Sequence, residues 1–280
     1  MLLADPVPAA SWRAELALAF ERRGTRTVLA SRRHEGPLVV QKPLYPEGGD
    51  ICHAIIVHPP AGIAGGDELH LAASLGTHAC ALLTTPGAAK WYRSAGPWAT
   101  SSLAFEVADG AALEWLPQET LVFDAARASM TTRVALTGSA RYIGWEIVCL
   151  GRTGSGERFD RGAAVMSIEI TRDGQPLFVE RTHVDGGGVL LDSPAGLAGS
   201  PVFGTLVAAA PSFDPALMRA CRAVDAPRGE GAVTQLPGLI VARYLGPGGE
   251  AARRWFAALW VMLRPSILQR AAVEPRIWRT

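Results

Sequence analysis

The chain has 280 residues and a formal net charge of +1, from 27 basic and 26 acidic side chains. This balance gives no electrostatic reason to expect nucleic acid or an anionic membrane as a partner. The length exceeds the usual size of one domain, but β-rich domains often run to about 200–250 residues. No shift in composition and no linker divides the chain, so we expect one domain over residues 1–280.

The cysteines indicate a reducing compartment. Cys52, Cys80, Cys149 and Cys221 are far apart in the sequence and form no C-x-x-C pair, which is typical of buried, reduced thiols. Residues 1–10 lack the basic and apolar regions of a signal peptide. No apolar run approaches the ~20 residues that a membrane span needs. We therefore expect a cytoplasmic protein.

Apolar residues in the first half of the chain recur at a spacing of two, which places them on one face of a β-strand. Short segments of this kind follow one another at roughly ten-residue intervals, separated by Gly, Pro or Asp, and this leaves no room for helical crossovers. The pattern predicts a mainly β fold. The expected strands are 12–20, 27–30, 38–41, 51–58, 69–75, 79–85, 103–107, 112–116, 130–136, 142–149, 163–172, 176–184 and 204–209.

About two α-helices are expected toward the C-terminus. Asp214 followed by Pro215 is typical of an N-cap and the first helical position, and one apolar face follows. A second helix is expected over residues 249–263, ended by Pro265. Its apolar face is wide, which favours packing on the sheet over a partner-binding surface. The apolar faces are Leu217, Met218, Cys221 and Val224 in the first helix, and Trp255, Leu259 and Met262, broadened by Phe256 and Trp260, in the second.

The segment Cys52-His53-Ala-Ile-Ile-Val-His58 contains residue types that bind transition metals. In a strand, however, His53 faces away from Cys52 and His58, which stand ~20 Å apart along the same face. One ion cannot be held by all three. Structural histidines are the favoured interpretation, with separate weak contacts to a passing ion as the alternative.

Two loops are rich in glycine. Residues 151–157 lack the Lys-Ser/Thr of a phosphate-binding loop and carry Glu157 near that position. We interpret them as a turn, with Arg152 and Glu157 as a candidate ion pair. In His58-Pro-Pro-Ala-Gly-Ile-Ala-Gly-Gly-Asp67, the prolines fix an extended entry and the glycines permit positive φ or close backbone approach. A tight loop ending in a carboxylate is a candidate functional element, although an ordinary hairpin would have the same pattern.

Enzymatic signatures are absent from the sequence. There is no G-x-S-x-G or H-E-x-x-H, and no spacing of Ser, His and Asp assembles a triad. A β-rich hydrolase or carbohydrate-active enzyme would need Glu114, Glu119 or Glu157 to meet in one pocket. This is the alternative function that the sequence leaves open.

Several blocks together resemble one family, the urease accessory proteins called UreD or UreH. They occur in the family's order between residues 36 and 184, with a family-like "PRIW" near the C-terminus. One departure is Ala61, which replaces the first glycine of the family's Pro-Pro-Gly-Gly turn. The blocks are "GPLVVQKPLYPEG" (36–48), "HPPAGIAGGDEL" (58–69), "TTPGAAKWYRS" (84–94), "LEWLPQET" (113–120), "GWEIVCLGRTGSGERF" (144–159) and "VERTHV" (179–184).

The resemblance implies an elongated, helical or stacked β-sheet architecture with a few helices. It also implies a scaffold rather than an enzyme, which binds the accessory protein UreF and, through it, the GTPase UreG. This assembly would dock on apo-urease and deliver nickel, which would pass through the interior of the UreD-like chain. No permanently bound cofactor is implied, only nickel in transit.

Nickel in transit needs ligands weak enough to release it, and carboxylates meet this need better than a closed His/Cys site. The acidic residues inside the matching blocks are therefore the candidate nickel contacts: Asp67, Glu146 and Glu180. The competing interpretation is a structural role in salt bridges, for example between Glu180 and Arg181 or an arginine of another strand.

Overall fold

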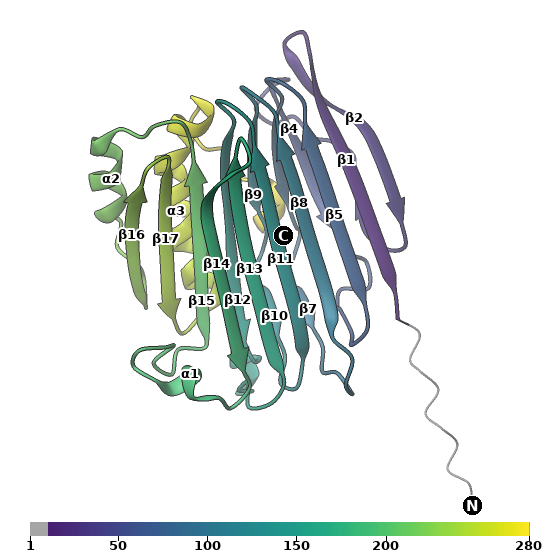
Figure 1. Ribbon diagram of the computed structural model, residues 1–280, viewed down its shortest axis with the longest axis vertical. Coiled ribbons are helices and arrows are strands. Elements are labelled where there is room, and N and C mark those ends of the chain that lie inside the picture. The colour runs from purple at the N-terminus through teal and green to yellow at the C-terminus, as the bar shows by residue number, and fades with distance from the viewer. Residues whose placement is uncertain (1–10, 280) are drawn as a thin grey trace, which may run out of the picture.

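The structure is a computed structural model that describes residues 11–279. Within these residues, the strands form two sheets that face each other, with helices beyond one of them (Figure 1). The seven-stranded sheet has the order β14 (Gln175–Asp185), β13 (Ala163–Arg172), β11 (Arg127–Leu136), β8 (Ala99–Val107), β5 (Glu68–Leu75), β1 (Arg13–Arg23), β2 (Arg26–Glu35). The ten-stranded sheet has the order β16 (Glu230–Leu236), β17 (Leu239–Gly246), β15 (Val202–Ala209), β12 (Arg141–Leu150), β9 (Ala112–Leu116), β6 (Cys80–Thr84), β4 (Ile51–Val57), β3 (Val39–Val40), with β10 (Thr120–Val122) and β7 (Ala89–Trp91) attached at β12.

From β4 to β13 the chain winds alternately through the two sheets. Strands β5, β8, β11 and β13 pair in parallel in one sheet, and β4, β6, β9 and β12 pair in parallel in the other. Each return pass is itself a strand, so parallel pairing needs no helical crossover. The result is a stack of β-coils, which confirms the expected mainly β, stacked architecture.

The predicted strands are all present, with ends that differ by a few residues. The sequence pattern missed β7, β10, β16 and β17. Strand β16 shows why, because six of its seven residues are exposed and its Gly, Ala, Thr and Gln side chains give no strong alternation. Pairing with β17 holds it in the sheet.

The main core lies between the two sheets and is built from the inward side of each strand. A second core lies on the outer side of the ten-stranded sheet, where helices pack against it. Strand β12 contributes to both, with Tyr142 and Val148 facing the seven-stranded sheet and Trp145 and Ile147 facing the helices. Both faces of β12 are therefore covered along most of its length, and eight of its ten residues are buried.

The helices are α1 (Val189–Asp192), α2 (Pro215–Arg222) and α3 (Gly249–Leu268). As predicted, Asp214 caps α2, because its carboxylate accepts a hydrogen bond from the Ala216 amide at 2.7 Å. Helix α3 packs on the ten-stranded sheet, as expected from its wide apolar face. Among residues 11–279, no helix combines the length and the apolar character that a bilayer crossing requires.

Two predictions for α3 are wrong. The helix does not end before Pro265 but continues to Leu268, because Arg264 and Ile267 are fully buried and anchor the last turn. Proline removes one helical hydrogen bond, and these tertiary contacts offset that loss. Met262 is 38% exposed, so it lies outside the buried face, which Trp255, Leu259 and their neighbours form.

All four cysteines are free. Cys52, Cys149 and Cys221 are buried, as predicted, and Cys80 is partly buried. Burial raises the pKa of the Cys149 thiol to about 12 and that of Cys221 to about 11, so both are protonated, apolar packing groups at neutral pH.

Candidate functional site: a polar band between the sheets

A cavity of about 250 Å³ lies between the two sheets. Its walls come from β4, β9 and β12 on one side and from β5, β8 and β11 on the other, and they are mostly apolar. Among the lining residues, Ala61, Gly87 and Ala89 are exposed. The cavity therefore opens to solvent beside the loop that begins at His58.

At the inner end of this cavity, polar side chains replace the apolar core. Glu146 in β12 pairs with Thr205 in β15, and Thr205 pairs with Arg243 in β17. Residues directly opposite one another in antiparallel strands share a face of the sheet. These three residues therefore form one row on the ten-stranded sheet, directed at the seven-stranded sheet.

The opposing sheet supplies the partners of this row. Thr132 in β11 and Glu180 in β14 both pair with Ile168 in β13, so they lie in one row across the seven-stranded sheet. From β8 to β1 that row is apolar, with Leu103, Leu71 and Leu16, and it ends at His34 in the edge strand β2. We call the five residues Thr132, Glu146, Glu180, Thr205 and Arg243 the polar band.

Glu146 is the most perturbed carboxyl group of the polar band. It accepts a hydrogen bond from the Thr132 hydroxyl, and its remaining accessible surface faces the cavities that it lines. Burial raises its pKa to about 7, and the charge of Glu180 acts in the same direction. Near neutral pH, Glu146 is therefore present in both protonation states.

Glu180 is held at both carboxylate oxygens. Oε1 accepts a hydrogen bond from the Thr205 hydroxyl at 2.8 Å. Oε2 accepts from Nε and Nη2 of Arg243, at 3.0 and 2.6 Å. The arginine of another strand that the sequence suggested as a salt-bridge partner is thus Arg243, which gives Glu180 a direct counter-ion.

A second, smaller cavity of about 20 Å³ lies between Glu146 and Glu180, which both line it. This volume is enough for about one water molecule. Glu146 and Val148 line both cavities. The two carboxylates chosen from the sequence therefore line the same small cavity, although 33 residues separate them in the chain.

Asp67 occupies a different position. Its Oδ1 accepts a hydrogen bond from the Trp12 amide at 2.9 Å, and its Oδ2 accepts from the Ala64 amide at 2.8 Å. It is not among the residues that line either cavity. Its carboxylate closes the loop that begins at His58 and ties the loop to the start of β1.

The backbone of this loop meets the needs that its glycines indicated. Ala61 adopts φ of 59°, the left-handed conformation that the glycine of the family motif would allow. At Gly62, a Cβ atom would lie 1.9 Å from the Tyr92 ring, so the ring packs directly on the backbone. Ala61, which replaces the family's glycine, thus adopts a backbone conformation that glycine would also allow, and the turn is retained.

His58 lines the large cavity and is half-buried. Burial lowers its pKa, and the nearby charge of Asp67 opposes that shift. A neutral imidazole therefore faces the cavity near its opening. As strand geometry predicted, Cys52 and His53 face opposite sides of β4 and cannot share one ion with His58. A separate weak contact between His58 and a passing ion stays a prediction.

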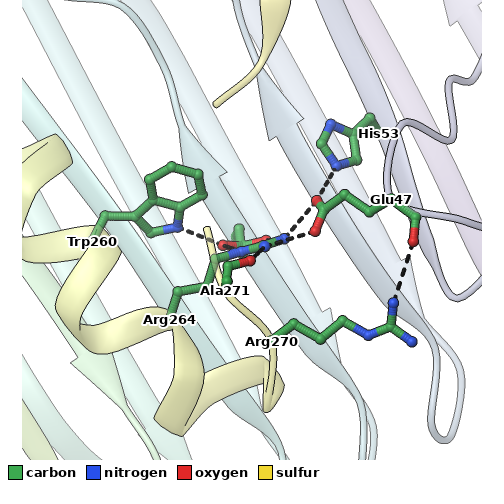
Figure 2. Close-up of polar contacts among 7 residues, drawn as sticks. Glu47, His53, Trp260, Arg264, Arg270 and Ala271 are labelled. Carbon is green, nitrogen blue, oxygen red and sulfur yellow. Dashed lines mark hydrogen bonds and ion pairs between the residues drawn. The ribbon is translucent and has the colours of Figure 1, made fainter. Parts of the chain in front are cut away.

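Cys52 belongs to the core between the sheets, whereas His53 joins a buried ionic cluster on the other face (Figure 2). His53 Nε2 lies 2.7 Å from Glu47 Oε1. Arg264 of α3 donates to both oxygens of Glu47, at 2.7 and 2.6 Å. The favoured interpretation of His53 as a structural histidine is therefore confirmed.

Glu114, from the alternative enzymatic interpretation, lies in the same cluster. It is fully buried and receives hydrogen bonds from Arg264 and from the Trp260 indole. Burial raises the pKa of Glu114, and Arg264 opposes this shift. Glu119 lies 4.0 Å from Arg253, and Glu157 pairs with Arg152 at 2.5 Å. The three glutamates thus have separate partners, and none of the four cavities described is lined by more than one of them.

Within residues 11–279, no three His, Cys, Asp or Glu side chains come together as a group able to hold a metal ion. The polar band has two carboxylates in series instead. Thr132, Thr205 and Arg243 were not predicted from the sequence to be part of it. A polar or charged residue inside an otherwise apolar strand, such as Arg243 within residues 239–246, is the signal that could have located them.

Comparison with known proteins identifies the family. The family model described as UreD urease accessory protein matches residues 13–279. The chain belongs to the UreD family of urease accessory proteins. A protein of Azoarcus sp. (strain BH72) named urease accessory protein UreD is 58% identical over 269 residues, which cover 96% of this chain and 94% of the relative.

Other UreD proteins match over almost their whole length. The protein of Dechloromonas aromatica (strain RCB) is 52% identical over 282 residues, covering 99% of this chain and 98% of the relative. That of Pseudomonas aeruginosa is 52% identical over 271 residues, covering 96% of each. These relatives are named as accessory proteins, in agreement with the family resemblance of the sequence blocks.

Proposed function

We propose that this UreD-family chain helps load nickel into urease as a chaperone and conduit rather than as an enzyme. The ion would move along the interior path from the cavity opening to the polar band. The observation that carries this proposal is that Glu146 and Glu180 line one cavity between the sheets. Two carboxylates along a path can bind a dication in turn without trapping it, because each supplies few ligand atoms.

The opening of the large cavity offers further weak donors. The neutral imidazole of His58 lines the cavity, and the carboxylate of Asp67 is close enough to act on the His58 pKa. Imidazole nitrogen and carboxylate oxygen both suit nickel. In this proposal Asp67 attracts the ion at the opening, and Glu146 and Glu180 receive it inside.

The proposed partners are those that the family resemblance implies. We propose that the chain binds UreF and, through it, UreG, and that this assembly docks on apo-urease in the cytoplasm. Nickel is the cargo of this assembly, and the chain retains no cofactor of its own.

The test is co-expression of the chain with UreF, UreG and apo-urease, followed by pull-down and by measurement of nickel in purified urease. Glu146→Gln, Glu180→Gln and Asp67→Ala should leave the pull-down intact and lower the nickel content. Glu169→Gln is the matched control, because Glu169 is an exposed residue of β13. Wild-type nickel content in all three variants would reject the interior path, and equal loss of pull-down and nickel would indicate a folding defect.

A further inference from the structure

Arg243 lies between the other residues of the polar band and solvent. Its side chain is 54% exposed, whereas that of its partner Glu180 is 21% exposed. Two of its nitrogens, Nε and Nη2, donate to the same carboxylate oxygen. The guanidinium therefore covers Glu180 from the outer side, while the small cavity borders Glu180 from the inner side.

This arrangement limits how strongly Glu180 can bind a cation. Its Oε2 accepts from both Nε and Nη2 of Arg243, so a dication that binds Oε2 must displace the guanidinium. The guanidinium also neutralises the charge that would attract a second cation. Because Arg243 is about half exposed, it can exchange its contact with Glu180 for water at small cost.

We propose that Arg243 is a displaceable counter-ion that keeps the interior nickel site weak and so permits release. In the resting protein it pairs with Glu180, and it moves toward solvent when nickel reaches Glu180. It returns as the ion leaves. This inference rests on the proposed function and assigns a positioning residue to it.

A purely structural role makes a different prediction. Glu180 belongs to β14 of the seven-stranded sheet and Arg243 to β17 of the ten-stranded sheet, so the ion pair also joins the two sheets. If that is its whole role, removal of Arg243 lowers stability and leaves the nickel affinity of the folded protein unchanged. Nickel affinity therefore distinguishes the two roles.

The experiment is titration of the purified full-length chain with Ni²⁺ against a competing chromophoric chelator. Arg243→Gln should raise the nickel affinity by about fivefold, equivalent to about 1 kcal/mol, the upper value for an exposed ion pair. Arg243→Lys, which keeps the charge, should stay close to wild type. Arg254→Gln is the matched control, because Arg254 is an exposed arginine paired with Glu250 on α3.

A double variant tests whether Arg243 affects nickel affinity through Glu180. In Glu180→Gln protein, Arg243→Gln should no longer raise nickel affinity, because the carboxylate that it exposes is absent. Arg243→Met, which keeps an aliphatic side chain at this position, carries the same expectation as Arg243→Gln if the glutamine variant does not fold. Unchanged or weaker nickel binding by folded Arg243→Gln or Arg243→Met protein that retains Glu180 would overturn the proposal.

Failure of the proposed function would give a different result from failure of the role proposed for Arg243. If Glu146→Gln and Glu180→Gln lower nickel binding but Arg243→Gln does not raise it, the interior path stands and the role of Arg243 is rejected. If neither glutamate variant changes nickel binding, the interior path is rejected, and the role of Arg243 with it.

Discussion

The guanidinium of Arg264 donates hydrogen bonds to both carboxylate oxygens of Glu114, at 2.9 and 3.1 Å, and both side chains are fully buried. The two residues lie 150 positions apart in the chain. This pair, with Glu47 as a second partner of Arg264, fixes helix α3 to the ten-stranded sheet (Figure 2). The cluster explains why the end of α3 is ordered by tertiary contacts rather than by its own sequence.

Loss of Arg264 should be severely destabilising. Arg264→Ala leaves the buried carboxylates of Glu114 and Glu47 without their counter-ion, which should cost about 3–5 kcal/mol of the free energy of unfolding. Chemical denaturation monitored by circular dichroism measures this. Arg270→Ala is the control, since Arg270 is 42% exposed in its ion pair with Asp50 and should cost less than about 1 kcal/mol. Similar losses in both variants would contradict the importance of the buried cluster.

The raised pKa of Glu146 should make the stability of the protein depend on pH. Its pKa is about 7 in the folded protein, against an ordinary value of 4.5. Between these values the folded state binds more protons than the unfolded state, so stability falls as pH rises from about 4.5 to about 7. The contribution is up to about 3 kcal/mol. Glu146→Gln should remove this part of the pH dependence, as measured by urea denaturation at several pH values.

The effect of Glu146 on the pH dependence of stability is confined to the pH range between its pKa values in the unfolded and folded states. Well above pH 7 the carboxyl group is ionised in both the folded and the unfolded state, and the difference in stability between wild type and Glu146→Gln should become constant. A variant that retains the full decrease in stability between pH 4.5 and pH 7 would show that another group causes it.

Gly62 should not accept a side chain. An alanine Cβ would lie 1.9 Å from the Tyr92 ring, and this overpacking should destabilise Gly62→Ala by about 1–3 kcal/mol. Gly87→Ala is the control, because nothing lies within 4 Å of the corresponding Cβ position. Thermal denaturation measures both. The effect of Gly62→Ala should shrink in a Tyr92→Ala background, and an equal loss there would exclude the ring as its cause.

Trp278, within the C-terminal "PRIW" block, should contribute strongly to stability. It is 8% exposed, its indole donates to the Thr84 hydroxyl at 2.8 Å, and it packs against Trp145 and Trp260. Trp278→Ala should cost about 3–5 kcal/mol, and Trp278→Phe should cost less because it keeps an aromatic ring. Trp12→Ala, at a side chain 51% exposed, should have little effect in the same denaturation assay.

Much of the local structure was predictable because its causes are local. Alternation of apolar residues locates a strand through the two-residue repeat of its side chains, and β13 is found at its observed ends, Ala163–Arg172. The Asp214-Pro215 pair marks the start of α2 because it satisfies helix-end donors within one turn. The same alternation predicted that Cys52 and His53 face opposite sides of β4.

The pairing of strands could not be predicted from local sequence. In the stacked coils, the parallel neighbour of a strand lies beyond an intervening strand of the other sheet, as for β5 and β8. No periodicity in β5 indicates that neighbour. Strand β16 was missed for a related reason, because its pairing with β17, rather than a strong pattern of its own, places it in the sheet. Strand β17 was missed although residues 239–246 form a mostly apolar run, because so short a run does not by itself distinguish a strand from a buried helical segment.

The candidate site was likewise predictable only in part from the sequence. The order of the sequence blocks was sufficient to indicate the UreD family and to select Glu146 and Glu180 as acidic residues of interest. Only the tertiary structure decided that these two line one cavity, that Arg243 neutralises Glu180 and that Asp67 closes a loop at the opening. The physical reason is that burial, pKa and ion pairing depend on groups distant in sequence, such as Arg243, which is 63 positions from Glu180.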